Sequence, residues 1–383
     1  MVSFGRAPER APSIGGGQVV EKHQVRVSRT ALEAFCGKVF RRLGLSEEDA
    51  VISASVIVAA DAMGIASHGV GRLHRWVDGL KGGLMLPAAP MEVLLETPSS
   101  LVLHAHGGMG APVSVKAMRS VIDKALANGS AFACVKDSNH FGIAGYYARL
   151  ALKEDMIGIA MTNTAALGVP TFGRTAIFGT NPLAFAAPAG EEHSFVLDMS
   201  TTVVPRGKLE LYHRTGRKLP AGWAVDKTGR SAQLAHSLFA DMMDQAGGGI
   251  LPLGGQGTLH SGHKGYGLAV MVDILCAVLC GAPFGADVID TPESHARVSH
   301  FFGALRIGCF RDPREFRRGM DRMLRSLRTS PAAEGEERVY YAGLQESEKE
   351  AECLVRGVPL TGETYRQLCA IGTDFSVEVP PVL

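Results

Sequence analysis

Apolar residues recur at helical spacing in the first part of the chain. They lie three or four positions apart, at Leu32, Phe35, Val39 and Leu43. A second stretch, rich in Ala and Val, covers residues 46–63, and Ser28 and Ser46 precede the two stretches as predicted N-caps. The pattern predicts a helical unit over residues 28–81, which ends at the Gly- and Pro-containing connector 82–87.

Between residues 98 and 200 the pattern changes to short apolar runs that alternate with helical stretches. The predicted strands cover residues 101–104, 131–135, 157–161, 183–187 and 195–197, and the predicted helices cover 112–128 and 143–154. This alternation is typical of a mixed α/β domain. Residues 205–262 contain many glycines and predict loops, a helical pattern returns over 264–280, and the charged segment 312–338 is predicted to be exposed.

These elements predict an α/β (α+β) fold in two parts. Residues 25–90 and 258–383 together form a mainly helical domain, and residues 91–257 form a central mixed α/β domain. Residues 1–24 are rich in Arg, Pro and Gly and predict a disordered extension.

The composition narrows the class of protein. The 383 residues are 46% hydrophobic and 20% charged, which is typical of a soluble globular protein. A formal net charge of +1 gives no electrostatic basis for binding nucleic acid or an anionic membrane, so we expect neither partner. The apolar run 267–286 approaches membrane-spanning length, but it contains Asp273 and lacks basic flanks, so we predict a buried helix.

The seven cysteines show no C-x-x-C spacing and lie mostly among apolar neighbours. This pattern indicates free thiols in a reducing compartment. The N-terminal segment contains no apolar secretory stretch. We therefore expect a cytoplasmic location.

The segment Ser67-His-Gly-Val-Gly-Arg72 carries the first candidate chemistry. If it opens a helix, His68 and Arg72 share one face. The guanidinium would then clamp a carboxylate, and the imidazole would exchange a proton with a small keto acid. In the alternative interpretation, Ser67 is an N-cap and the other two side chains are solvated. Taken alone, the segment favours this alternative.

A second histidine, His140, follows Asn139 at a predicted strand-to-helix junction, a place where catalytic residues often lie. None of the glycine clusters has the G-x-G-x-x-G spacing of a Rossmann domain, and no P-loop is present. The pairs His104/His106 and His260/His263 have no neighbouring cysteine or carboxylate cluster, so we predict no metal site.

Further motifs occur in one order along the chain. These segments are 67–72, 138–142, 162–164, 179–182, 198–201, 206–208, 219–223 with Asp226, and 264–267. Together they closely resemble the type-2 malate/L-lactate dehydrogenase family over about residues 28–375. The resemblance implies an NAD- or NADP-dependent enzyme with a nicotinamide-binding fold unrelated to Rossmann domains. It further implies a homodimer and a substrate that is a small 2-hydroxy or 2-keto acid such as malate, lactate or sulfolactate.

The resemblance also implies roles for individual residues. It implies catalytic roles for His140, His68, Ser67 and Lys208, and substrate contacts for Arg72, Thr180, Arg206 and Gly207. It implies cofactor contacts for His140, Thr164, Asp198, Met199, Ser200 and Lys264. Segment 342–345 departs from a Pro-Gly-Glu-like pattern that approaches the cofactor in the family.

Lys208 stands where members of the family that reduce cyclic imino acids have an aspartate. An ammonium stabilises a developing alkoxide or a second carboxylate, so Lys208 favours a 2-hydroxy-acid dehydrogenase. A reductase of cyclic imino acids of the piperideine- or pyrroline-2-carboxylate type is the alternative, and a binding protein without catalysis is a third interpretation. The choice between NAD and NADP, and between His68 and His140 as the proton-exchanging group, stays open.

Overall fold

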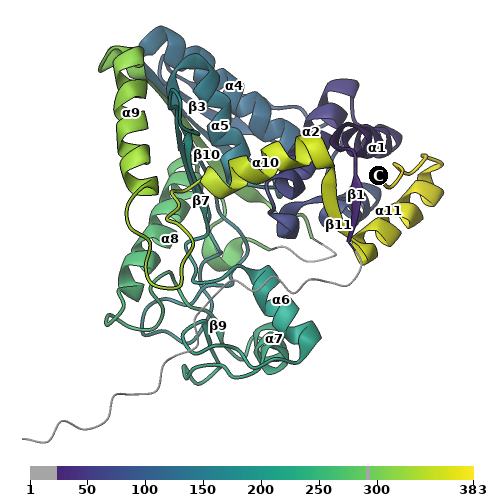
Figure 1. The fold of residues 1–383 in the computed structure, drawn as a ribbon. Coiled ribbons are helices and arrows are strands. Elements are labelled where there is room, and N and C mark those ends of the chain that lie inside the picture. Colours follow the sequence, from purple (N-terminus) through teal and green to yellow (C-terminus); the bar gives the residue numbers. More distant parts are fainter. Residues whose placement is uncertain (1–23, 290–293) are drawn as a thin grey trace, which may run out of the picture.

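The computed structural model describes residues 24–289 and 294–383, so the predicted N-terminal extension lies outside the described residues except for its last residue. A seven-stranded sheet with the order β2-β3-β4-β10-β5-β6-β7 forms the centre (Figure 1). Its strands are β2 (Glu92–Glu96), β3 (Ser100–His104), β4 (Ser130–Ser138), β5 (Met156–Thr162), β6 (Leu183–Ala187), β7 (Phe195–Met199) and β10 (Val298–Arg306). Strands β3 and β4 pair in parallel and all other neighbours pair antiparallel, which confirms a mixed sheet.

All five strands predicted for residues 98–200 are confirmed, whereas β2 and β10 were not predicted. Strand β10 lies in the middle of the sheet, between β4 and β5. Its residues 298–304 are all buried, so the strand lacks the alternation of polar and apolar positions that marks a half-buried strand. Residues 298–306 therefore lie in the sheet and not in the helical part to which we assigned them.

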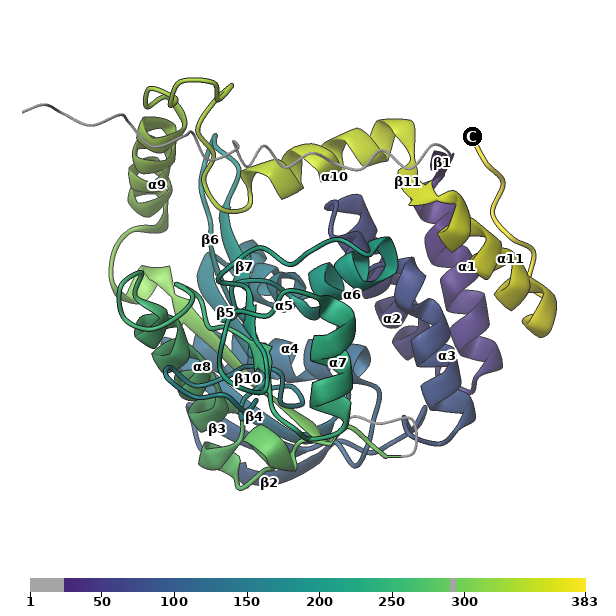
Figure 2. The ribbon, with the colours of Figure 1, turned by 90° about the horizontal axis from the view of Figure 1, so that it is seen from below.

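Helices cover both faces of the sheet (Figure 2). The predicted helices α4 (Gly110–Asn128) and α5 (Ala144–Leu150) pack on one face, where Phe302 joins the main hydrophobic core. Helix α8 (Gly262–Cys276) packs on the other face, where Phe301 contacts Val272 and Met161. Successive residues of β10 thus point to opposite sides, as expected for a strand.

Helix α8 and the short helical turn that follows it (Gly262–Cys280, 19 residues) are long and apolar enough to cross a membrane by length and composition. Val272 and Cys276 are buried against the sheet, and Asp273 accepts a hydrogen bond from Asn181. The opposite face is apolar and exposed at Ile274, Val278 and Leu279, with exposed fractions of 50%, 53% and 60%. The predicted buried helix is thus confirmed for one face only.

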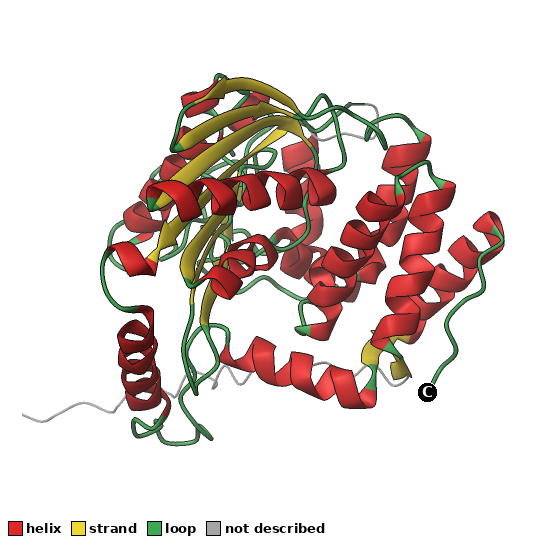
Figure 3. Ribbon diagram, turned by 90° about the horizontal axis from the view of Figure 1, so that it is seen from above, coloured by secondary structure: helices red, strands yellow, loops and turns green. Residues whose placement is uncertain are grey.

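The two ends of the described chain meet on the helical side of the molecule, away from the central sheet (Figures 1 and 3). Strand β1 (Gln24–Val27) pairs antiparallel with β11 (Val358–Thr361). The surrounding helices are α1 (Arg29–Arg42), α2 (Glu47–Ala62), α3 (Leu73–Lys81), α10 (Leu344–Arg356) and α11 (Gly362–Phe375). Ser46 caps α2 by accepting a hydrogen bond from Asp49 N, as predicted. Ser28 occupies the N-cap position of α1 but makes no capping hydrogen bond, so that detail was wrong.

Residues 205–262, predicted as loops, contain α6 (Arg206–Thr215), α7 (Ala235–Met243) and a small pairing of β8 (Ala224–Val225) with β9 (Gly249–Ile250). Each helix buries few residues: Leu209 in α6, and Ala235 with Leu238 in α7. Helices this short present too few core positions to give a clear period in the sequence.

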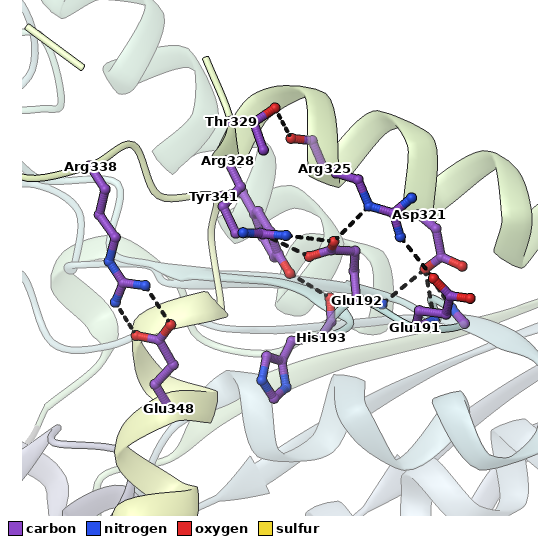
Figure 4. Close-up of polar contacts among 11 residues, drawn as sticks. Glu191, Glu192, His193, Asp321, Arg325, Arg328, Thr329, Arg338, Tyr341 and Glu348 are labelled. Atoms are coloured by element: carbon purple, nitrogen blue, oxygen red, sulfur yellow. Dashed lines mark hydrogen bonds and ion pairs between the residues drawn. The ribbon is translucent and has the colours of Figure 1, made fainter. Parts of the chain in front are cut away.

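The charged segment 312–338 contains the exposed helix α9 (Pro313–Arg328), which holds the turn between β6 and β7 (Figure 4). Asp321 Oδ1 accepts hydrogen bonds from three successive backbone N–H groups, those of Gly190, Glu191 and Glu192. Arg328 pairs with Glu192 at 3.0 Å. These contacts fix the hairpin whose second strand, β7, contains Asp198.

Candidate active site

The segment Ser67–Arg72 wraps around a buried carboxylate and does not form a continuous helix. Two short 3₁₀ turns, Ala66–His68 and Val70–Arg72, flank Gly69, and α3 begins only at Leu73. Asp61 Oδ2 accepts a hydrogen bond from Val70 N at 2.6 Å. A Cβ on Gly69 would lie 2.1 Å from the Asp61 carboxyl atoms, so only glycine fits there.

Both sequence interpretations of this segment were therefore wrong in their geometry. His68 and Arg72 do not share one helix face, because extended backbone at Gly69 separates the two turns. Ser67 is not an N-cap, because the N-cap position of α3 is Arg72. Burial raises the pKa of Asp61 to about 7, although the hydrogen bond from Val70 opposes this rise.

The loop that carries His140 is fixed at several points. It joins β4 to α5, which confirms the predicted strand-to-helix junction. Asn139 Nδ2 donates to the carbonyls of Gly107 and Gly108 at 2.9 and 3.0 Å. Helix α4 begins directly against the loop, since a Cβ on Gly110 would lie 2.1 Å from Asn139 O.

The two predicted histidines lie together. The His68 and His140 rings stack, with centroids 5.6 Å apart and an interplanar angle of 19°. Ser67 Oγ lies 2.9 Å from His68 Nδ1, and Gly142 N donates to His140 Nδ1 at 3.3 Å.

Both imidazoles are held in the neutral form. Burial lowers the pKa of His68 to about 4, and the Arg72 charge acts in the same direction. Burial also lowers the pKa of His140 well below its usual value, with further contributions from His68, Arg75 and Arg72. A neutral imidazole can accept a proton at one nitrogen and donate a hydrogen bond at the other, so the pair is prepared to act on a hydroxyl group.

Arg72 already contacts a carboxylate. Its Nε donates to Ser67 O at 2.9 Å, and its Nη2 donates to Glu210 Oε2 at 3.4 Å. Glu210 belongs to α6, and the first turn of α6 lies beside the site, because a Cβ on Gly207 would be 3.7 Å from Ser67 Cβ. A guanidinium with five N–H donors keeps capacity for a further carboxylate.

The predicted substrate contact Arg206 and the predicted catalytic residue Lys208 both lie in the first turn of α6. Arg206 Nε pairs with Glu210 at 2.9 Å, and the exposed Lys208 places its Nζ 5.5 Å from the centre of the Trp223 ring. Lys208 thus lies in the first turn of a helix, and not on the loop that the sequence indicated.

Thr180 and Thr164 contact each other directly. Thr180 N donates to Thr164 Oγ1 at 3.0 Å, and Thr164 N donates to Asn181 Oδ1 at 3.3 Å. Asn181 Nδ2 in turn donates to Ala269 O at 2.9 Å, which ties this turn to α8. The two predicted contacts thus form one unit with the helix that carries Lys264.

Lys264 is exposed in the first turn of α8. The backbone places this turn beside the residues that follow β7: a Cβ on Gly265 would lie 2.2 Å from Leu253 O, and Leu253 N donates to Thr201 O at 2.8 Å. Ser200 precedes Thr201, and its Oγ donates to Thr202 O at 3.2 Å.

A cavity of about 300 Å³ lies between α5, β7 and the segment that leads into α10, and neither His68 nor His140 lines it. It is lined by Met63, Ile65, Ile143, Gly145, Arg149, Val196, Leu197, Asp198, residues 340–343, Gln345, Glu346 and Ser347. Ile65 and Ile143 each stand three positions from a histidine of the pair, and Met199 directly follows Asp198.

The Asp198 carboxylate is one of the charged groups that line the cavity. Its Oδ2 accepts a hydrogen bond from Gly145 N at 2.7 Å, and burial raises its pKa to about 6. Arg149 also lines the cavity, but its charge is paired with Glu350 at 2.7 Å. Among residues 24–289 and 294–383, no three His, Cys, Asp or Glu side chains are grouped to hold a metal ion.

The sequence analysis missed two residues of the site. Asp61 could have been noticed, because it is an acid inside an Ala- and Val-rich helical stretch. Glu210 lies four positions after Arg206, the spacing of a helical ion pair. Segment 342–345 was singled out through the family resemblance, and Ala342, Gly343 and Gln345 line the cavity together with Asp198.

Comparisons of the sequence and of the structure with known proteins all match dehydrogenases. Residues 27–369 match the malate/L-lactate dehydrogenase family. The chain is 41% identical over 360 residues to malate dehydrogenase from Pyrococcus abyssi, covering 94% of this chain and 97% of the relative. It is 36% identical to L-sulfolactate dehydrogenase from Methanocaldococcus jannaschii, covering 89% and 94%. The crystal structure of malate dehydrogenase from Entamoeba histolytica superimposes with a TM-score of 0.89 at 32% identity, covering 94% and 100%.

Proposed function

The chain belongs to the malate/L-lactate dehydrogenase family, and from this premise we propose how its site works. The protein is an NAD(P)-dependent oxidoreductase that transfers a hydride between nicotinamide and a small 2-hydroxy or 2-keto acid. The observation that carries our assignment of residues is the stacked, neutral pair His68–His140 next to Arg72. The pair supplies proton exchange and a hydrogen bond to the substrate oxygen, and the arginine supplies carboxylate binding.

The cavity at Asp198 has the polarity expected for the sugar of a dinucleotide. A carboxylate that accepts one backbone N–H retains lone pairs for ribose hydroxyls, and a volume of about 300 Å³ suits a nucleoside-sized group. The dinucleotide, when bound, supplies or accepts the hydride. Met199 and Ser200 follow Asp198 in the chain, and we propose that they contact the rest of the dinucleotide together with Thr164 and Lys264.

The charges of the cavity favour NAD over NADP. With the adenosine ribose in this cavity, Asp198 and Glu346 would repel the 2′-phosphate that NADP carries there, and the Arg149 charge is already paired with Glu350. We expect NADH to bind at least about tenfold more tightly than NADPH, a difference of about 1.4 kcal/mol. Fluorescence titration measures both dissociation constants, and tighter binding of NADPH would contradict this preference.

Arg72 is the proposed clamp for the substrate carboxylate. Glu210 shows that a carboxylate reaches the guanidinium, and an incoming acid would replace or join it. Arg206 and Lys208 on the neighbouring turn of α6 suit a second acidic group on the substrate. Malate and sulfolactate, after which two relatives are named, each carry such a group. Together with Thr180, these residues support a dianionic substrate.

His68 is the proposed proton-exchanging residue. Gly142 N–H occupies His140 Nδ1, so the neutral His140 ring carries its hydrogen on Nε2 and can only donate there. His68 Nδ1 faces the Ser67 hydroxyl, which can donate or accept, so His68 can change its protonation without losing that contact. We therefore assign proton exchange to His68, supported by Ser67, and hydrogen-bond donation to the substrate oxygen to His140.

The pH dependence of the wild-type enzyme and two variants tests this division. Oxidation needs neutral His68. With saturating cofactor, so that titration of Asp198 does not limit the rate, kcat/KM for the hydroxy acid should stay constant from pH 8 to about 5 and fall as the pH approaches the His68 pKa of about 4. His68→Ala should lower kcat by about 10²–10⁴-fold and remove this fall, whereas His140→Ala should keep it. The reverse pattern would exchange the two roles.

The reaction itself is tested by the absorbance of reduced nicotinamide. Purified protein is incubated with NADH or NADPH and with oxaloacetate, sulfopyruvate, pyruvate or a cyclic imino acid. Turnover of a keto acid, fastest with the dianionic ones, is the expected result. Turnover of the cyclic imine alone would replace the proposed substrate class, and Arg72→Lys should mainly raise KM because it loses the bidentate geometry.

We also propose that the protein acts as a homodimer in the cytoplasm. The exposed apolar face of α8 at Ile274, Val278 and Leu279 suits a second copy of the chain, and all seven cysteines are free thiols. Light scattering should show a dimer that Val278→Asp disrupts. Leu354→Asp, at an exposed apolar residue of α10, serves as the matched control. A monomeric wild type would refute the assembly.

A further inference from the structure

A third histidine, His300, lies directly behind the active-site loop. It is fully buried in β10, opposite Val135 of β4 and Thr162 of β5. The pairing of β10 with β4 is irregular between Val298 and His300. His300 faces the same side of the sheet as Phe302, toward the core under α4 and α5.

Both ring nitrogens of His300 have a hydroxyl partner. Nδ1 lies 2.8 Å from Thr162 Oγ1, and Nε2 lies 2.9 Å from Ser138 Oγ. Burial lowers the pKa of His300 to about 3, although the Asn139 backbone acts in the opposite direction. The ring is therefore neutral, and it donates at one nitrogen and accepts at the other.

The His300 ring also supports the loop by stacking. Its centroid lies 4.6 Å from that of Phe141, with an interplanar angle of 4°. His300 thus contacts residues on both sides of His140: Ser138 through a hydroxyl, Asn139 through the backbone and Phe141 through its ring. A histidine that only filled core volume would not need to contact the loop at all three positions.

We propose that His300 is a positioning residue that holds His140 in register with His68 and the substrate. This inference rests on the proposed function, because it requires that His140 acts on the substrate oxygen. His300 touches neither substrate nor cofactor in this scheme. It acts through the Ser138–Phe141 segment, and a displacement of about 1 Å at the reacting group lowers rates by up to about a hundredfold.

A double-mutant cycle tests the proposal. His300→Phe keeps the ring and its stacking surface but removes both hydrogen bonds. We expect kcat to fall about 10- to 100-fold while the dissociation constant of NADH changes less than about twofold. In the His140→Ala background, His300→Phe should leave kcat almost unchanged. An equal loss in both backgrounds would overturn the proposal.

Two further variants separate positioning from a general loss of stability. Phe301→Leu alters the same strand on its opposite face, away from the loop. We expect it to lower the free energy of unfolding about as much as His300→Phe does but to leave kcat unchanged. Ser138→Ala removes only the hydroxyl that faces Nε2 and should reproduce part of the kcat loss. If His300→Phe does not fold, Ser138→Ala takes its place in the cycle with His140→Ala.

A readout without turnover keeps this test independent of the proposed function. In protein labelled with ¹⁵N-histidine, the ring signals of His140 are assigned by comparison with His140→Ala. His300→Phe should shift or broaden these signals, and Phe301→Leu should not. Unchanged His140 signals would overturn the positioning role. A wild type without dehydrogenase activity, but with shifted His140 signals in His300→Phe, would refute the proposed function alone.

Discussion

Asp61→Asn should remove a large pH dependence of stability. Asp61 is only 5% exposed, and its carboxyl accepts a hydrogen bond from Val70 in the turn that carries His68 and Arg72. Burial raises its pKa from an ordinary value of 3.8 to about 7. The amide oxygen of asparagine can still accept the Val70 hydrogen bond, but the side chain no longer ionises.

The magnitude follows from proton linkage. Between pH 3.8 and about 7 the folded state holds a proton at Asp61 that the unfolded state has released, so the free energy of unfolding falls as the pH rises. A difference of about three pKa units, at about 1.4 kcal/mol each, corresponds to about 4 kcal/mol. This stability is fully present below pH 3.8 and is lost once the pH exceeds about 7.

Urea unfolding at pH 4.0, 5.0, 6.0 and 7.5, followed by tryptophan fluorescence, measures this effect. The difference in the free energy of unfolding, variant minus wild type, should rise by about 4 kcal/mol across the series. Other buried acids such as Asp198 are common to both proteins and cancel in the difference. Asp123→Asn, at an exposed position of α4, should give a flat difference. A flat difference for Asp61→Asn as well would refute the reasoning.

Three further predictions concern the site. Gly69→Ala should destabilise the protein by about 1–3 kcal/mol in urea unfolding, because its Cβ would meet the Asp61 carboxyl; an unchanged free energy would contradict the described turn. Asp198→Asn should weaken NADH binding about tenfold in a fluorescence titration, and equal affinity would exclude the carboxylate from the cofactor site. Lys208→Met should raise KM for oxaloacetate more than KM for pyruvate, and equal changes would remove Lys208 from recognition of a second acidic group.

The sequence predicted most of the central sheet, for a physical reason. The strands over residues 101–104, 131–135, 157–161, 183–187 and 195–197 are short apolar runs bounded by turn residues or helices, and each was found. Strand β10 was missed because both of its faces are buried and because it pairs with strands more than 130 residues earlier in the chain. No local pattern reports such a long-range pairing.

The active site was predictable as a set of residues but not as a geometry. The motifs at His68 and His140 gave the residues that now stack on each other. Their spacing suggested a helical face, whereas the buried carboxyl of Asp61 and the absent side chain of Gly69 produce a tighter turn. Helical periodicity in a sequence predicts regular helices. It fails where a single buried polar group, here the Asp61 carboxyl, determines the conformation of the backbone.

The charges of the site connect its three central residues. Burial, with the nearby Arg72 charge acting in the same direction, lowers the pKa of both His68 and His140, so both rings are neutral in the free enzyme. A substrate carboxylate on Arg72 would oppose that positive charge and thereby raise the pKa of His68. Binding of the acid would then make His68 a stronger base at the moment when the hydroxyl proton leaves. Since kcat reports the complex and kcat/KM reports the free enzyme, the acidic fall of kcat should lie at higher pH than that of kcat/KM.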